Sequence, residues 1–195
     1  VTYIRETVRA LSGAHSPYLY TESEAATRSV QRAGAEVVQI DRNGLGEGTE
    51  RLLEYFSRSG LTTADVLRKR LPTLVAARQD GTLRHLNDTL DVVVTHNYLD
   101  DVLLSNVVDV PVVTVFHGAA QVGAGTKLWN RFSNGDGVVA NSRHTAERLE
   151  HHFDCEVDGV VYPGIDLETF RPDVEPAFDR DETVVMFAGR FTKEK

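Results

Sequence analysis

Residues 91–97, DVVVTHN, and residues 110–118, VPVVTVFHG, share one pattern in which a short apolar run ends in a histidine. Both runs are continuous and do not alternate between apolar and polar residues. Continuous runs are typical of parallel strands that helices cover on both faces. The sequence therefore predicts an α/β protein with a doubly wound parallel sheet. The expected strands span residues 17–20, 35–40, 91–95, 111–116, 137–140, 157–162 and 183–188.

Segments with helical periodicity fill the gaps between these strands. Gly34 and Gly60 stand where a helix should end, because glycine readily adopts the left-handed conformation that closes a helix. Alternating strands and helices indicate a Rossmann-like sheet. The expected helices span residues 2–11, 22–33, 49–59, 64–71, 73–79, 98–106 and 142–152.

We interpret both ends of the sequence as cut. A doubly wound domain normally opens with a buried strand, whereas residues 2–11 already form an amphipathic pattern. The stretch 171–181, RPDVEPAFDRD, is rich in proline and acidic residues and is typical of a linker. The strand at 183–188 follows it without a domain to pair with. We expect a missing first strand and a missing second domain.

The composition excludes several classes of protein. Lys and Arg number 21 against 29 Asp and Glu, so the formal charge of −8 excludes a basic nucleic-acid-binding protein. The single cysteine, Cys155, excludes an internal disulfide framework and any metal site built from several thiolates. No apolar run approaches the roughly 18 residues of a membrane-spanning helix. We expect a soluble protein of the reducing cytoplasm.

Histidines follow two of the predicted strands directly. His96 and Asn97 come after the strand at 91–95, and His117 and Gly118 come after the strand at 111–116. In open parallel sheets, ligands bind at the carboxyl ends of the strands. The two imidazoles could therefore serve one cleft, or each could simply satisfy backbone groups near a strand end. Periodicity leaves both interpretations open.

Two glycine-rich segments are weak signals for phosphate binding. Residues 44–48, GLGEG, lie between a strand and a helix, but their spacing does not fit a dinucleotide fingerprint and Glu47 would repel phosphate. We interpret them as a flexible loop. Residues 123–125, GAG, would let a loop approach a ligand closely, with equally little specificity.

Four neighbouring residues near the end of a predicted helix are of kinds that commonly bind metals, but we interpret them as part of an ordinary helix end. Adjacent residues on a helix point about 100 degrees apart, so neighbouring histidines do not share a face. We expect the lone thiol to be buried and inert. The group consists of His151, His152, Asp154 and Cys155.

Five segments, in order, resemble the family 4 (group 1) glycosyltransferases of the GT-B fold, in which two Rossmann-like domains face each other across a cleft. They are DVVVTHNYLDDVLL (91–104), VPVVTVFHG (110–118), DGVVANSRHTAERL (136–149), VVYPGIDLETFRP (160–172) and VVMFAGRFTKEK (184–195). The resemblance implies an acceptor-side domain over residues 1–172, a linker over 173–182, and the start of a donor-binding domain over 183–195.

The resemblance also implies roles for individual residues. His117 corresponds to the catalytic histidine of the family's cleft, beside the transferred sugar. Arg190 and Lys195 correspond to the pair that contacts the diphosphate of a nucleotide-sugar donor in place of a metal, so neither a metal nor a further cofactor is expected. Gly164 and Asp166 correspond to a structural turn in which Asp166 caps a short helix ending near Phe170. The residues implied to line the cleft are His96, Asn97, Gly118, Asn141 and Ser142.

The implied activity is transfer of a sugar from a nucleoside diphosphate sugar to an acceptor hydroxyl with retention of configuration. We expect the 195 residues alone to be inactive, because the resemblance places much of the donor site beyond them. The alternatives are a GT-B sugar-nucleotide epimerase and a non-catalytic α/β binding module.

The acceptor could be lipid-linked, a glycan or a small molecule. Peripheral contact with the inner face of a membrane is a further hypothesis. Arg68, Lys69 and Arg70 form the dense cationic cluster that would serve it, although the charge of −8 opposes binding to anionic lipid.

Overall fold

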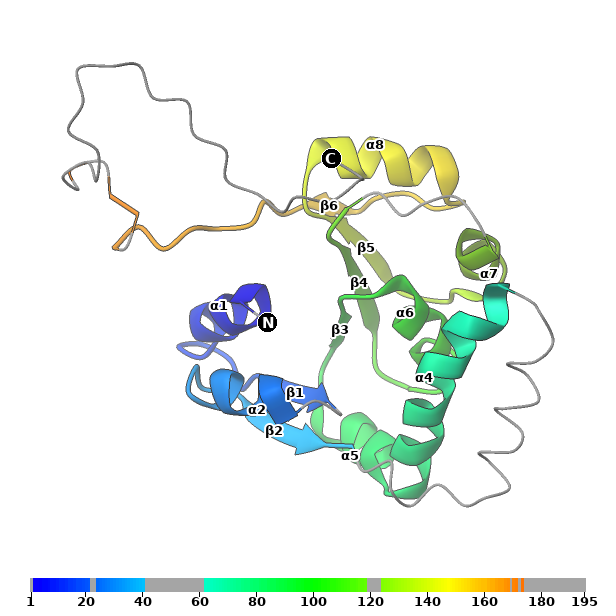
Figure 1. The fold of residues 1–195 in the computed structure, drawn as a ribbon, viewed down its shortest axis with the longest axis horizontal. Helices are drawn as coiled ribbons and strands as arrows, with labels where there is room; N and C mark the ends of the chain where they lie inside the picture. Colours follow the sequence, from blue (N-terminus) through cyan, green and yellow to red (C-terminus); the bar gives the residue numbers. More distant parts are fainter. Residues whose placement is uncertain are drawn as a thin grey trace. The chain divides into compact units, whose positions relative to one another are not determined.

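A computed structural model describes residues 2–21, 24–40, 62–118, 124–168, 170–171 and 173 (Figure 1). Strands and helices alternate along much of this part of the chain. In order, the elements are α1 (Thr2–Leu11), β1 (Tyr18–Thr21), α2 (Glu24–Gln31), β2 (Glu36–Gln39), α4 (Thr62–Gln79), α5 (Thr82–Thr89), β3 (Val93–Thr95), α6 (Tyr98–Leu104), β4 (Val112–Phe116), α7 (Ala124–Phe132), β5 (Gly137–Ala140), α8 (Arg143–His152) and β6 (Gly159–Val160).

Every strand pair in the described ranges is parallel. β1 pairs with β2, and a second sheet has the order β3-β4-β5-β6. A helix connects each strand of the second sheet to the next, which is the βαβ connection that parallel strands require. The fold is α/β and Rossmann-like, as the sequence predicts. We call β3–β6 with α6, α7 and α8 the four-stranded half, and β1–β2 with α1 and α2 the two-stranded half.

Aromatic side chains fill the core of the four-stranded half. Phe116, Trp129 and Phe153 pack edge to face, with ring centroids 5.4, 5.5 and 6.0 Å apart. Each ring is at most 4% exposed. Edge-to-face packing aligns the positive edge of one ring with the negative face of another. This core therefore fixes β4 against α7 and against the end of α8.

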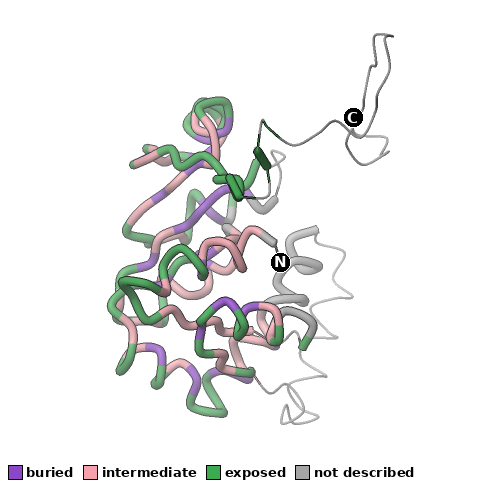
Figure 2. The backbone as a smooth tube through the Cα atoms, turned by 90° about the vertical axis from the view of Figure 1, so that its left-hand side faces the viewer, coloured by how far each residue is buried: buried purple, intermediate pink, exposed green. Residues whose placement is uncertain are grey.

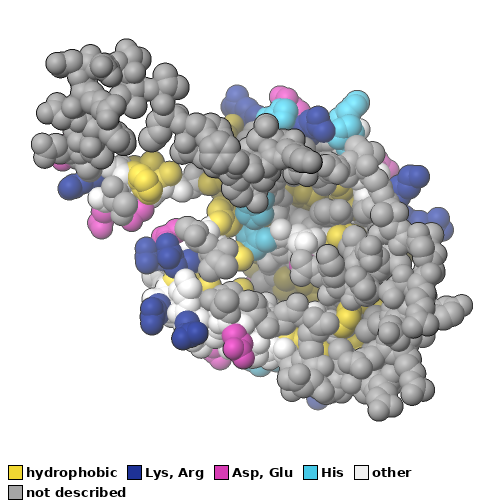
Figure 3. Space-filling model, viewed as in Figure 1, with side chains coloured by type: hydrophobic (Ala, Val, Ile, Leu, Met, Phe, Trp, Pro, Cys, Tyr) yellow, Lys and Arg dark blue, Asp and Glu magenta, His cyan; other side chains and the backbone are white. Residues whose placement is uncertain are grey.

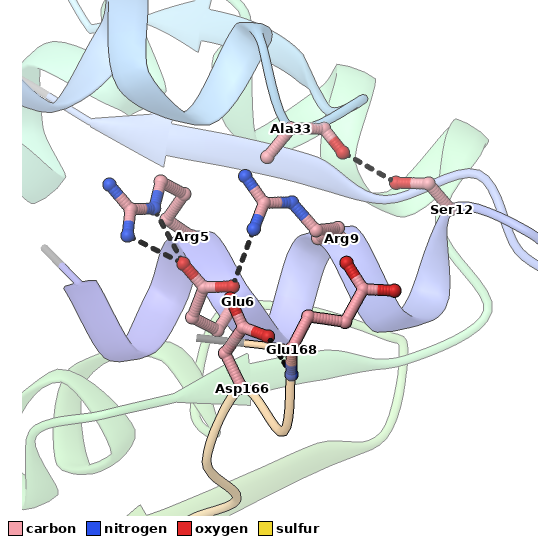
Figure 4. A network of polar contacts seen from close by, with 7 residues as sticks. All are labelled: Arg5, Glu6, Arg9, Ser12, Ala33, Asp166 and Glu168. Carbon is pink, nitrogen blue, oxygen red and sulfur yellow. Dashed lines mark hydrogen bonds and ion pairs between the residues drawn. The ribbon is translucent and has the colours of Figure 1, made fainter. Parts of the chain in front are cut away.

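The core of the two-stranded half is smaller and aliphatic. α1 places Ile4 and Val8, four residues apart, on one face, where they meet the buried Val30 of α2. The opposite side of α1 carries an exposed network in which Glu6 accepts hydrogen bonds from Arg5 and Arg9 (Figure 4). Exposed ion pairs contribute about 0–1 kcal/mol, so the buried face holds α1 in place.

Gly34 ends the turn after α2, as the sequence predicts, and two constraints require glycine there. Its φ of +105° lies in the left-handed region. A Cβ at this position would also lie 2.6 Å from the Ser12 hydroxyl. That hydroxyl donates to the carbonyl of Ala33 at 3.0 Å and so joins the end of α1 to the end of α2 (Figure 4).

The extent to which a strand is buried depends on its position in the sheet. β4, with a neighbour on each side, is buried at four of its five residues. β3 pairs only with β4 within the described ranges, and its Val94 is 50% exposed. The expectation that continuous apolar runs are covered on both faces thus holds for β4 and not for β3. Buried positions occur as short stretches within separate elements (Figure 2).

Three helical predictions differ from the structure. The expected helices 64–71 and 73–79 are one helix, α4, with Pro72 inside it. Proline removes one backbone hydrogen bond, but packing of α4 against α5, α6 and α7 offsets this loss. α5 was not expected. α7 begins at Ala124, where glycine at 123 and 125 had indicated a loop, and the buried Trp129 explains why the helix forms.

The chain divides into two compact units, Val1–Pro163 and Gly164–Lys195. The predicted helix at 49–59, the predicted strand at 183–188 and most of the predicted linker lie outside the described residues. The domain boundary at residue 172 therefore stays a prediction.

Candidate active site

Three consecutive strands bring their carboxyl ends to one edge of the sheet. In the register of β3, β4 and β5, Thr95 lies opposite Thr114, and Phe116 lies opposite Ala140. The next residues along the chain are the predicted site residues His96, His117 and Asn141. The parallel register therefore gathers at one edge three positions that are up to 45 residues apart in the sequence.

His96 and His117 form a hydrogen-bonded pair. Nδ1 of His96 and Nε2 of His117 are 2.9 Å apart, and the ring centroids are 5.1 Å apart. Tyr3 of α1 meets both rings edge-on, with centroids 5.6 Å from His96 and 4.6 Å from His117. Histidine side chains are visible at the surface of the molecule in Figure 3. Tyr3 thus packs against both rings, while His117 stays exposed to solvent.

Both imidazoles are neutral at neutral pH. Burial, followed by the nearby His117, lowers the pKa of His96 from 6.5 to about 4. Burial also lowers the pKa of His117. A neutral imidazole has one N–H and one free lone pair, so each ring can accept one hydrogen bond and donate another. The pair is suited to accepting a hydrogen bond from a neutral hydroxyl.

Asn141 holds the backbone of His117. Its side-chain amide donates to the carbonyl of His117 at 2.8 Å, and its own backbone N–H donates to the carbonyl of Phe116 at 3.0 Å. Its amide oxygen accepts from the hydroxyl of Thr145 at 2.8 Å, which accepts from the hydroxyl of Ser142 at 3.0 Å. A chain of hydrogen bonds therefore runs from the start of α8 to His117.

The other predicted cleft residues have local structural roles. Asn97 caps α6 by accepting from the N–H of Leu99 at 3.0 Å. Ser142 caps α8 by accepting from the N–H of Thr145 at 3.1 Å. A Cβ at Gly118 would meet nothing within 4 Å among the residues whose positions are described. Of the predicted set, the structure joins His96, His117 and Asn141.

A buried polar cluster below the edge was missed by the sequence analysis. The hydroxyls of Thr95 and Thr114 are 2.9 Å apart. Asp101 of α6 is fully buried and accepts from the Ser133 hydroxyl at 2.5 Å, whereas its Oδ1 has no hydrogen-bond partner in the described part of the chain. Burial raises the pKa of Asp101, and the bond from Ser133 opposes this rise. In the sequence, Asp101 looks like an ordinary first-turn helix acid.

In the second unit, Asp166 forms the predicted turn, and none of the described residues that follow it is helical. Its carboxylate accepts from the N–H of Glu168 at 2.9 Å (Figure 4), and its carbonyl accepts from the N–H of Phe170 at 2.8 Å. Residues 167 and 168 form a turn. Gly164 has no positive φ, and a Cβ there would meet no described atom within 4 Å.

Several predicted positions lie outside the described residues. They include the diphosphate pair Arg190 and Lys195 and the loop at 44–48. For Arg68, Lys69 and Arg70 the structure describes only the backbone, which lies within α4.

Cys155 is a partly buried, unpaired thiol. Burial, followed by the charge of Glu150, raises its pKa to about 11, so the thiol is protonated and unreactive at neutral pH. The described residues contain no group of three or more His, Cys, Asp or Glu side chains that could hold a metal ion. Among these same residues, no helix combines the length and the apolar character that crossing a bilayer requires.

Comparison with known proteins identifies the family. Residues 1–169 match the sequence profile of Glycosyltransferase Family 4. The chain belongs to glycosyltransferase family 4. This assignment agrees with the order of the strand-end motifs, and the match covers every strand and helix described above. No curated protein and no solved structure matches this glycosyltransferase.

Proposed function

We propose that this family 4 glycosyltransferase transfers a sugar from a nucleoside diphosphate sugar to an acceptor hydroxyl, with retention of configuration and without a metal. The observation that carries the proposal is the neutral His96–His117 pair at the carboxyl edge of the sheet. Ligands of open parallel sheets bind at this edge.

In the proposed reaction, the acceptor oxygen forms a bond to the anomeric carbon and the bond from that carbon to the diphosphate oxygen breaks. With retention, the new bond forms on the face that the diphosphate leaves, and the acceptor proton departs with the diphosphate. The exposed His117 ring would accept a hydrogen bond from a sugar or acceptor hydroxyl and so orient it. Correct orientation of a reacting group by such a contact is worth about 10² in rate.

The leaving diphosphate carries charge that must be stabilised. The family resemblance assigns this role to Arg190 and Lys195, whose fixed cations would replace a divalent ion. The proposed acceptor carries a hydroxyl group. A lipid-linked acceptor would place the reaction at the inner face of a membrane.

The test is a transfer assay of the protein expressed from its complete gene, with a panel of uridine, guanosine and adenosine diphosphate sugars. We expect one donor to yield a product with the anomeric configuration of that donor, unaffected by EDTA. His117→Ala should reduce the rate by about 10²-fold, whereas His15→Ala, a change at an exposed histidine beyond the end of α1, should not.

An inverted product or loss of activity in EDTA would overturn the corresponding part of the proposal. Conversion of the donor sugar without any acceptor would instead identify an epimerase.

A further inference from the structure

We propose that His96 is a positioning residue for His117, accepting the Nε2–H of His117 at its own Nδ1 and leaving His117 Nδ1 free to accept a hydrogen bond from a substrate hydroxyl. This inference rests on the proposed function, because it states which ring nitrogen of His117 faces the substrate. It goes beyond that function by assigning the tautomer of each ring.

The geometry restricts how His117 can work. Its Nε2 is 2.9 Å from Nδ1 of His96 and is therefore already in a hydrogen bond. Its Nδ1 has no hydrogen-bond partner among the described residues, and the side chain is exposed. A ligand at the strand edge can consequently reach His117 through Nδ1 alone.

Only two neutral arrangements satisfy the bond between the rings. In one, His117 donates from Nε2 and both rings are Nε2–H tautomers. In the other, His96 donates from Nδ1 and both rings are Nδ1–H tautomers. Both arrangements make the same hydrogen bond, so the intrinsic preference of the ring decides between them, and the Nε2–H tautomer is the more stable form of a neutral histidine side chain in water. We therefore assign Nε2–H to both.

Other contacts hold His117 in the geometry that this assignment needs. Asn141 fixes the backbone carbonyl of His117 at 2.8 Å, and His96 fixes the ring. Tyr3 packs edge-on against both imidazoles and limits their rotation. The low pKa of His96 keeps its Nδ1 lone pair available as an acceptor.

The direct test is NMR of the protein labelled with ¹⁵N at histidine, which distinguishes protonated from unprotonated ring nitrogens. At neutral pH we expect Nδ1 of both His96 and His117 to be unprotonated. In His96→Ala, the His117 signals should move to those of a freely exchanging imidazole. In His96→Asn they should stay, because the Asn Oδ1 lies two bonds from Cβ, as the His Nδ1 does.

Protonation at Nδ1 of His117 in the wild-type protein would overturn the assignment. Unchanged His117 signals in His96→Ala would overturn the pairing. If His96→Ala does not fold, the wild-type spectrum and His96→Asn still decide the question. None of these readings depends on activity, so the absence of transferase activity in the protein expressed from its complete gene would refute the proposed function and leave the tautomer result intact.

A second measurement compares amide replacements in the transfer assay. His117→Asn keeps an oxygen at the position of Nδ1, whereas His117→Gln keeps one at the position of Nε2. We expect His117→Asn to retain about tenfold more kcat than His117→Gln, and His96→Ala to lose about 10–100-fold in kcat that His96→Asn restores, because misplacement of a reacting group costs rates of this order. The reverse order of the two His117 variants would contradict the assignment.

Discussion

The two halves of the unit Val1–Pro163 use the same parallel strand pairing but are packed differently. In the four-stranded half, three nearly inaccessible aromatic rings pack edge to face below the strand ends that carry His117 and Asn141. In the two-stranded half, the core consists of Val8, Val30 and small alanines. An isolated pair of strands is marginally stable, so this half depends on its helices and on contacts with its neighbour.

This difference explains where the candidate site lies. Side chains that orient a substrate must be held within about 0.5 Å, which requires a rigid support. His96 and His117 follow strands of the four-stranded half, and the two-stranded half contributes Tyr3. The difference in packing between the two halves leads to predictions of unequal size.

The largest effect is expected from Trp129→Ala in α7. Trp129 is 3% exposed and contacts both Phe116 and Phe153. Its truncation should cost about 3–5 kcal/mol in free energy of unfolding, because a cavity opens in the aromatic core. Denaturant unfolding measures this loss. Phe132→Ala on the same helix, where the ring is 48% exposed, is the matched control and should cost under about 1 kcal/mol.

Gly34→Ala should destabilise the two-stranded half by about 2–3 kcal/mol, since alanine is strained at positive φ and its Cβ meets Ser12. Hydrogen exchange should show α1, α2 and β1 losing protection before β4 and β5. In a Ser12→Gly background the cost should fall to about 1 kcal/mol, because only the backbone strain remains. Equal costs in both backgrounds would show that the close approach to Ser12 is unimportant.

Acid should weaken the four-stranded half through His96. The pKa of His96 is lowered from 6.5 to about 4, so the unfolded chain binds this proton more tightly than the folded chain. The stabilising contribution is complete above pH 6.5 and is lost as the pH falls toward 4. We expect a loss of about 1–2 kcal/mol, reduced from the full linkage value by the partial exposure of the ring. His96→Asn should flatten the measured pH dependence of unfolding.

The smallest effect is expected where β1 meets α5 and the core cluster of Leu86, Val93 and Val112. The Tyr20 hydroxyl lies 2.9 Å from Nδ1 of His85, and Tyr20 packs against the core that includes Leu86 of α5. Tyr20→Phe removes the hydrogen bond and keeps the packing, so it should cost about 0.5–1.5 kcal/mol in thermal unfolding. A cost above that of Gly34→Ala would show that this link stabilises the molecule more than the core of the two-stranded half.

Much of the fold follows from the sequence because continuous apolar runs such as those of β4 and β5 are compatible with few structures other than parallel strands. The position of His96 beside His117 also follows, since parallel strands end at a common edge. Local rules failed where tertiary packing outweighs them. Pro72 does not interrupt α4, and α7 forms despite Gly125 because it buries Trp129.

The finer chemistry of the site could not be predicted in this way. No periodicity relates Tyr3 to two histidines more than 90 residues away. Asn97 and Ser142 cap helices, and their predicted place in the cleft stays a prediction. Which ring nitrogens of His96 and His117 meet depends on side-chain rotation, which residue types do not encode.

The central claim is that His96 and His117 act as one unit in sugar transfer. A double-mutant cycle on kcat, with His96→Ala, His117→Ala and the double variant, tests it most directly. Residues that act as a unit give non-additive losses, so the double variant should be no slower than His117→Ala alone. If the two losses multiply, the histidines act independently and the account is wrong.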